Sequence, residues 1–284
     1  MKDVRLIALD MDGTLLMSDH WTLPQRNIEA IRRADAAGIH VCIATGRMLE
    51  DASDFIHRFE LPCAIIAANG ARASDGALPG GKILFQCSFA PEDAHKAIDL
   101  LMASGMMING FEDGLVSTVQ DGTRRVYHLV ARGLIDARYG EAALRAAADR
   151  GLMKLFAVGL GSDIGDTPDA RIAPLRESLR RALPHLQITS SASGNIEIMP
   201  AEAGKGAALA RLAAHFGLTR EAVMAMGDAQ NDLSMLQYAA HSVAMGNATP
   251  EVRAFCRYET LSNDACGVAA MIDRVLAAKA TESV

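Results

Sequence analysis

The stretch that decides the fold is LIALDMDGTLL, from Leu6 to Leu16. Four apolar residues, Leu6 to Leu9, run directly into Asp10, and a short apolar run that stops at a turn is typical of a buried parallel strand. Asp10 is therefore expected at the carboxyl end of a central strand, where open α/β sheets bind their ligands. Asp12 follows two residues later, and two crowded carboxylates repel unless a hard cation such as magnesium relieves them. Because aspartate and glycine also favour ordinary turns, this stretch alone leaves a plain strand-end turn open.

Composition indicates an ordinary globular chain and excludes some partners. The chain has 284 residues, of which 50% are hydrophobic and 22% charged. Its formal net charge of -6 disfavours nucleic acid as a partner, because no overall basic field gathers phosphates. The five cysteines are scattered without a CxxC pair, which is typical of a reducing cytosol, and no apolar run suits a signal peptide or a membrane span. We therefore expect a cytoplasmic protein that binds neither nucleic acid nor membranes.

The order of the expected elements divides the chain into a core and an insertion. Residues 1–82 alternate strand and helix, the pattern of a doubly wound parallel sheet. After a break at Leu78-Pro79-Gly80-Gly81, residues 83–189 begin with an expected strand at Ile83–Phe89 and then mix hairpins with helices. The alternation returns in residues 190–284. The sequence thus predicts an α/β fold: a Rossmann-like core, residues 1–82 and 190–284, with an inserted α+β cap domain, residues 83–189.

Polar groups follow the expected core strands or begin the helices beside them. Besides Asp10 and Asp12 these are Thr45 and Gly46, Asn69, Lys205, and the group Asp228, Asn231 and Asp232. Carboxylates suit magnesium, whereas a hydroxyl, helix-start amides, a lysine and an asparagine amide suit phosphate oxygens. Lys205 and Thr45 make sense there only if an anion lies beside the metal, so the pattern predicts a site for a metal ion and a phosphate group. Asn69 is explained equally well as a turn residue.

With these motifs in order, the chain resembles the Cof-type branch of the haloacid-dehalogenase superfamily of phosphohydrolases. The four motifs are DMDGTL at Asp10–Leu15, ATGR at Ala44–Arg47, Lys205 in AGKGAAL, and GDAQND at Gly227–Asp232. The tail segments AMGNATPEVRA and SNDACGVA are also similar to that branch. One motif is moderately specific, but four in this order on compatible elements are strongly specific. The resemblance covers nearly the whole chain and implies that the insertion is the family's large type-two cap.

The resemblance also implies a role for each motif residue. Asp10 would be the nucleophile that forms an aspartyl phosphate, and Asp12 the acid that then acts as a base. Magnesium would be bound by Asp10, Asp228 and the main-chain carbonyl of Asp12, while Asp232 orients Asp228 or a metal-bound water. The groups implied to hold phosphate are the Met11 and Gly46 amides, Thr45, Lys205 and Asn231, with Asn69 contacting substrate where core meets cap. Arg47 is expected to pair with a local carboxylate instead of with substrate.

The leading hypothesis is a magnesium-dependent phosphatase for a small phosphorylated metabolite. A sugar phosphate is the first expectation for the substrate, and a phosphorylated vitamin or flavin precursor is the second. One alternative is a phosphomutase with the same cap type, which would return phosphate to a sugar instead of to water. The other is a non-catalytic binding module, which would usually have lost one of Asp10, Asp12, Lys205 or Asp228. Oligomeric state and substrate identity stay open at this point.

Overall fold

The computed structural model describes residues 1–112, 114–117, 127–159, 169–190 and 194–280. It divides the chain into two compact units. Met1–Phe85 and Gly204–Val284 form the first unit, and Gln86–Ala203 form the second.

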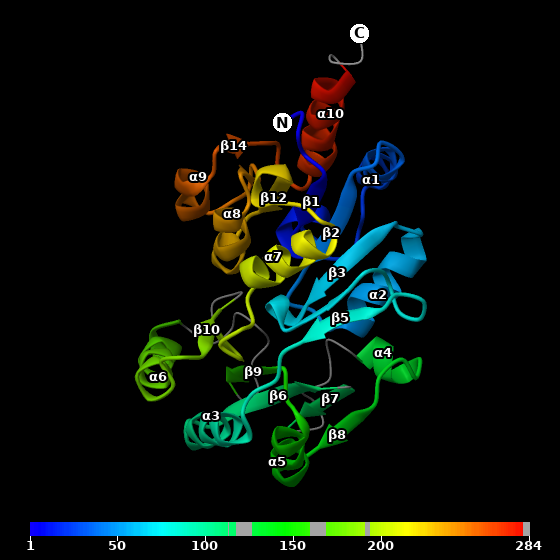
Figure 1. The fold of residues 1–284 in the computed structure, drawn as a ribbon. Helices are drawn as coiled ribbons and strands as arrows, with labels where there is room; N and C mark the ends of the chain where they lie inside the picture. Colours follow the sequence, from blue (N-terminus) through cyan, green and yellow to red (C-terminus); the bar gives the residue numbers. More distant parts are fainter. Residues whose placement is uncertain (113, 118–126, 160–168, 191–193, 281–284) are drawn as a thin grey trace. The chain divides into compact units, whose positions relative to one another are not determined.

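The first unit is built around an eight-stranded sheet (Figure 1). In spatial order its strands are β14 (Tyr258–Glu259), β13 (His241–Ala244), β12 (Val223–Gly227), β1 (Leu6–Leu9), β2 (His40–Ala44), β3 (Cys63–Ala67), β4 (Arg72–Ser74) and β5 (Ile83–Gln86). The strands from β14 to β3 run parallel, and β4 runs antiparallel to β3. Every residue of β1, β3 and β12 is buried, because a parallel sheet is covered on both faces.

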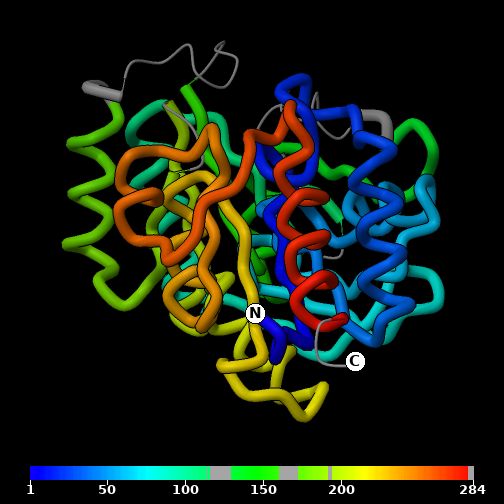
Figure 2. The backbone as a smooth tube through the Cα atoms, turned by 90° about the horizontal axis from the view of Figure 1, so that it is seen from above, coloured from blue at the N-terminus to red at the C-terminus, as the bar shows by residue number. Residues whose placement is uncertain are grey.

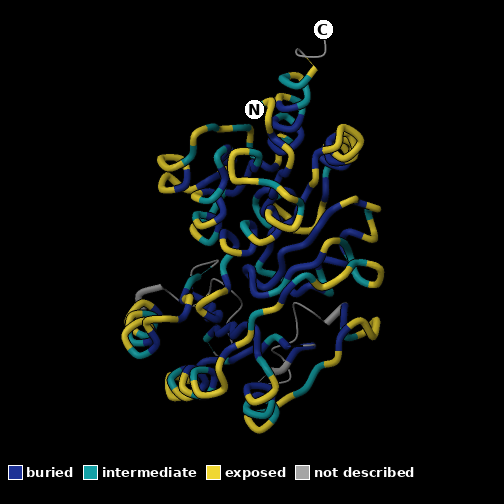
Figure 3. Tube along the Cα trace, viewed as in Figure 1, coloured by how far each residue is buried: buried dark blue, intermediate teal, exposed yellow. Residues whose placement is uncertain are grey.

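Helices flank this sheet and supply the apolar layers that cover it. They are α1 (Gln25–Ala36), α2 (Leu49–Phe59), α7 (Lys205–His215), α8 (Leu233–Tyr238), α9 (Pro250–Phe255) and α10 (Gly267–Ala280). Helix α1 packs beside α10, and α7 packs beside α8 (Figure 2). Ile28, Ile31 and Ala34 lie buried on one face of α1, as their spacing predicts, and the outer helix faces are exposed (Figure 3). The doubly wound parallel core predicted from the sequence is therefore confirmed.

The second unit has a six-stranded sheet of its own. Its order is β10 (Gln187–Thr189), β11 (Asn195–Met199), β9 (Lys154–Gly159), β6 (Met106–Glu112), β7 (Gly114–Ser117) and β8 (Ala137–Tyr139), antiparallel except for the last pair. The helices of this unit are α3 (Pro91–Ala103), α4 (Tyr127–Ala131), α5 (Glu141–Arg150) and α6 (Asp169–Ala182). Ile108, Leu155 and Ile196 pack in one apolar cluster with residues of α3, α5 and α6. Because side chains alternate along a strand, Asn109, Lys154 and Glu197 lie on the other face.

The boundaries between the units differ from those expected at 82/83 and 189/190. The strand expected at Ile83–Phe89 ends at Gln86, and it lies beside β4 in the eight-stranded sheet, so the break at 78–81 joins two core strands. At the other end, β10 and β11 pair with each other and β11 pairs with β9, which places residues 190–203 in the second unit. The expected boundary is early because it divides β10 from β11, which pair in one sheet.

Candidate active site

Two aspartates leave adjacent strands at the same edge of the eight-stranded sheet. The register pairs Leu9 of β1 with Met226 of β12, so Asp10 and Asp228 follow at neighbouring positions. The amide of Asp10 donates to the carbonyl of Met226 at 3.0 Å, which continues the ladder one residue beyond β1. Asp10 itself is 5% exposed. The apolar strands therefore fix one buried carboxylate and hold a second one beside it.

Lys205, the first residue of α7, joins two of the carboxylates. Its Nζ donates to Asp10 Oδ1 at 2.5 Å and to Asp232 Oδ1 at 2.6 Å, and its side chain is fully buried. Burial alone would lower the pKa of Lys205, but the two carboxylates outweigh that effect and the pKa is raised. Lys205 is therefore a fixed positive charge inside the site at any ordinary pH.

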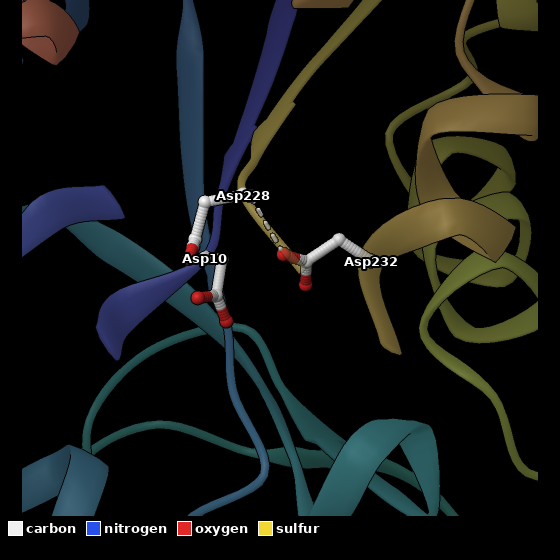
Figure 4. A group of neighbouring side chains, drawn as sticks. All are labelled: Asp10, Asp228 and Asp232. Atoms are coloured by element: carbon white, nitrogen blue, oxygen red, sulfur yellow. Dashed lines mark hydrogen bonds between the residues drawn. The ribbon is translucent and has the colours of Figure 1, made fainter. Parts of the chain in front are cut away.

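Asp10, Asp228 and Asp232 form an acidic cluster that suits a metal ion (Figure 4). Each offers a carboxylate oxygen, and these three oxygens lie within 4.8 Å of one another. Both oxygens of Asp232 are engaged, because Oδ1 accepts from Lys205 and Oδ2 accepts the Asp228 and Ala229 amides at 3.0 and 3.2 Å. Thr14 donates to Asp228 Oδ1 at 3.0 Å. The oxygens that fit a hard cation are therefore the second ones of Asp10 and Asp228, with Asp232 as their support.

The pKa values of this cluster are shifted as a crowded set of carboxylates requires. Burial raises the pKa of Asp10 well above its ordinary value. The negative charge of Asp232 raises it further, and the positive charge of Lys205 offsets these two effects only in part. Burial, and then Asp232, raise the pKa of Asp228 to about 7. A bound divalent cation would reverse both effects, since it favours the ionised form of each carboxylate.

The Asp12 carboxylate binds a cationic side chain that lies outside this cluster. Arg47 donates from Nη2 to Asp12 Oδ1 at 2.7 Å and from Nε to Oδ2 at 3.0 Å, and His20 Nδ1 lies 3.2 Å from Oδ1. Burial would raise the pKa of Asp12, but the Arg47 and His20 contacts outweigh it and lower the pKa. The expected pairing of Arg47 with a local carboxylate is confirmed. The Asp12 side chain is thus not among the clustered carboxylates, and the metal contact through its main-chain carbonyl stays a prediction.

The remaining predicted residues lie at the ends of neighbouring strands. Met11 is buried in the turn after β1, and Thr45 follows β2, where its Oγ1 accepts the Arg47 amide at 3.1 Å. The Asn69 amide donates to the Thr45 carbonyl at 3.0 Å, and Asn231 lies in the short helical turn Gln230–Asp232 before α8. Gly46 lies between Thr45 and Arg47. The direct contacts of the described residues join Asp10, Lys205, Asp228 and Asp232, and the phosphate-binding roles of the others stay predictions.

Sequence reasoning missed the residues that fix the turn after β1. Asn27 donates to the carbonyl of Leu15 at 3.1 Å, Asn263 to that of Leu16 at 3.0 Å, and Asn247 to that of Gly13 at 2.8 Å. The sequence could have indicated Asn27, because it is a polar residue on the apolar face of α1, where it is fully buried. Gly13 is required as glycine, because it has φ +83° and an added Cβ would lie 2.5 Å from an Asp228 oxygen.

Comparison with known proteins now decides the family. The family described as haloacid dehalogenase-like hydrolase matches residues 7–272. The chain belongs to this family. Among haloacid dehalogenase-like hydrolases of known structure, one from B. subtilis superposes with a TM-score of 0.82 at 26% identity, over 96% of this chain and 100% of its own. The resemblance drawn from the four motifs is thereby confirmed.

Curated relatives within the family are phosphatases. The chain is 32% identical to the 5-amino-6-(5-phospho-D-ribitylamino)uracil phosphatase YwtE of Bacillus subtilis, over 96% of this chain and 98% of the relative. It is 32% identical to an HMP-PP phosphatase of Cronobacter sakazakii, over 88% and 87% of the two chains. We therefore assign the chain as a phosphatase of the haloacid dehalogenase-like hydrolases, a hydrolase of phosphoric monoesters. Across the described ranges, none of its helices combines the length and apolarity needed to cross a bilayer.

Proposed function

We propose that this phosphatase uses magnesium to hydrolyse a small phosphorylated metabolite, a sugar phosphate or a similar ester, through an aspartyl phosphate on Asp10. One observation carries the proposal: Asp10 is held at the end of β1, 2.5 Å from Lys205 and within the acidic cluster. The relatives support small substrates, since one of them is named for a phosphorylated ribitylaminouracil. An ester of a sugar or of such a precursor is the class to assay first.

In the first half of the proposed reaction, a carboxylate oxygen of Asp10 bonds to phosphorus while the bond from phosphorus to the ester oxygen breaks. The departing oxygen takes a proton from Asp12. Lys205 reduces the repulsion between Asp10 and the phosphoryl oxygens, because its ammonium already lies against Asp10 Oδ1. A magnesium ion held by Asp10 and Asp228 would supply further positive charge against these oxygens.

In the second half, Asp12 accepts a proton from water, and the water oxygen bonds to phosphorus and releases Asp10. The Arg47 ion pair favours the ionised form of Asp12, which is the form this base requires. To donate a proton in the first half, Asp12 has to leave the guanidinium. The amides of Met11 and Gly46, with Thr45 and Asn231, would position the phosphoryl oxygens, and Asn69 would contact the rest of the substrate.

The test is to trap the phosphorylated protein. Rapid acid quench of a reaction with a phosphorus-labelled ester, followed by peptide mass spectrometry, is expected to find phosphate on the peptide that contains Asp10. Asp10→Asn should abolish the trapped species, and Asp12→Ala should slow both its formation and its breakdown. A wild-type burst of product without protein-bound phosphate would reject covalent catalysis and favour direct attack by a metal-bound hydroxide.

A further inference from the structure

The loop that follows β13, residues 245–249, contacts both of the loops that carry the clustered aspartates. The Thr249 amide donates to the carbonyl of Asp228 at 3.0 Å, which ties this loop to the end of β12. The Asn247 side chain donates from Nδ2 to the carbonyl of Gly13 at 2.8 Å, which ties the loop to the turn after β1. The two aspartate-bearing loops, which lie far apart in the sequence, are therefore joined through one short segment.

Asn247 uses both ends of its side-chain amide in these contacts. While Nδ2 donates to the Gly13 carbonyl, Oδ1 accepts the main-chain amide of Asn263 at 3.0 Å. Asn247 is nevertheless an exposed residue, whereas Asn27, which binds the same turn further along, is fully buried. Because an exposed side chain adds little to the apolar core, we interpret the two hydrogen bonds of Asn247 as fixing the position of the backbone.

Gly13 is the flexible link in the turn after β1. It has to be glycine at φ +83°, and glycine has more backbone freedom than any other residue. The residue before it is Asp12, whose main-chain carbonyl is a predicted ligand of magnesium. The residue after it is Thr14, whose hydroxyl donates to Asp228 Oδ1 at 3.0 Å. The hydrogen bond from Asn247 removes part of the freedom of Gly13, and it therefore fixes how the predicted ligands on the two loops are spaced.

We propose that Asn247 is a positioning residue of the metal site, which sets the affinity for magnesium and the preference for magnesium over calcium by holding the Gly13 carbonyl. The inference rests on the proposed function only in its use of magnesium. Magnesium requires a nearly ideal octahedral arrangement of oxygens at about 2.0–2.1 Å, whereas calcium accepts variable arrangements at about 2.3–2.6 Å. A looser turn should therefore weaken magnesium binding more than calcium binding.

The test is the affinity of the full-length protein for each ion, measured by isothermal titration calorimetry without substrate. Asn247→Ala should weaken magnesium binding by about tenfold or more, as the loss of a contact that supports a metal ligand does. Calcium binding should weaken by no more than about threefold, so the ratio of the calcium to the magnesium dissociation constant should fall. The exposed position predicts that the variant stays folded, which circular dichroism would show. An unchanged magnesium affinity, or an equal loss for both ions, would overturn the proposal.

Asp264→Ala is the matched control for the loss of a tether. Asp264 is exposed and accepts the Ser18 amide at 2.9 Å and the Ser18 hydroxyl at 2.7 Å, so it ties the chain after β1 to the segment before α10. The ratio of the two dissociation constants should stay within about twofold of the wild-type ratio, because an exposed charge acts on both divalent ions alike. A shift as large as that of Asn247→Ala would show that any tether has this effect, and it would overturn the proposal.

Asn247→Asp separates the hydrogen bond from the shape of the side chain. The variant side chain has the same shape and can still accept the Asn263 amide, but it cannot donate to Gly13. The ratio should fall as in Asn247→Ala, because the added charge acts on both ions alike. An unchanged ratio would overturn the proposal and leave the phosphatase intact. If the wild-type protein binds no magnesium, this inference and the metal part of the proposed function both fail. If Asn247→Ala loses magnesium but no phosphorylated protein can be trapped, only the proposed covalent intermediate fails.

Discussion

Each of the two units contains a buried lysine paired with carboxylate, and the two pairs differ in charge balance. In the first unit Lys205 is one ammonium against the three carboxylates Asp10, Asp228 and Asp232. In the second unit Lys154 lies 3.2 Å from Glu197, and both side chains are less than 5% exposed. The rings of Phe111 and Phe156 lie 5.4 and 5.8 Å from the Lys154 ammonium. A buried pair that sums to zero can be structural, whereas a buried excess of negative charge calls for a cation.

The largest expected effect is a loss of stability when the Lys154–Glu197 pair is broken. Such a loss would show that this pair is structural. Lys154→Met leaves Glu197 buried without its ammonium, so the free energy of unfolding should fall by about 3–5 kcal/mol. Urea unfolding followed by circular dichroism measures it. The double variant Lys154→Met with Glu197→Leu should recover most of the loss, because it removes both charges together. A double variant as unstable as the single one would contradict this interpretation.

The second prediction concerns the catalytic rate and not the stability of the fold. Lys205→Ala should lower kcat by about 10²–10³-fold, by analogy with the loss of one oxyanion donor, because Asp10 and the phosphoryl oxygens lose their shared positive charge. Phosphate release with magnesium is the measurement, on protein shown by circular dichroism to be folded. The double variant at Lys154 and Glu197 is the matched control, with kcat expected to change far less. Retention of kcat in Lys205→Ala would place Lys205 with the structural pair.

The third prediction tests the excess negative charge around Lys205 by varying the pH. Because the pKa of Asp228 is raised from 3.8 to about 7, its contribution to stability is fully present below pH 3.8 and is lost as the pH rises through about 7. Without metal, Tm should fall by about 2–4 °C from pH 6 to about pH 8, a loss on the order of 1 kcal/mol. Saturating magnesium should remove the slope, since it holds the carboxylates ionised, and Asp228→Asn should flatten it. An identical slope with and without magnesium would speak against a metal at this cluster.

The smallest change in stability is expected for an exposed ion pair whose charged atoms are similarly close together. Arg33 and Asp273 lie 2.6 Å apart, as close as Lys205 and Asp232, but their side chains are 54% and 36% exposed. Arg33→Ala should change the free energy of unfolding by no more than about 1 kcal/mol, because solvent and salt screen the pair. Urea unfolding at low and high salt is the measurement. A loss as large as that of Lys154→Met would mean that separation, and not burial, sets these energies.

The sequence predicted the parts of the site that depend on strand ends. Asp10, Thr45 and Asp228 each follow an apolar run, and such runs place a polar residue at the edge of a parallel sheet. Lys205 could be predicted only from the family motif AGKGAAL, because a lysine at the start of a helix is by itself an ordinary feature. These positions follow from local pattern, which a single sequence carries.

The parts that could not be predicted depend on long-range packing. The contact between Asn263 and the Leu16 carbonyl joins residues far apart in the chain, and no local pattern marks it. The rotamer that turns Asp12 toward Arg47 is set by the tertiary surroundings in the same way. The boundary at 190 is corrected by the same kind of contact, since β11 pairs with β9 in the sheet of the second unit.

Because the insertion splits the first unit, it affects how that unit folds during synthesis. Residues 86–203 are contiguous, whereas the first unit is split around them, and Leu6 pairs with Val223. When the ribosome has completed the insertion, Asp10, the proposed nucleophile, is already present, but Lys205 and β12 have not yet emerged. The amino-terminal half of the core can pair β1 with β2, but the other edge of β1 stays open until more than two hundred residues have been translated. We therefore expect this half to be exposed to aggregation for longer than the contiguous unit.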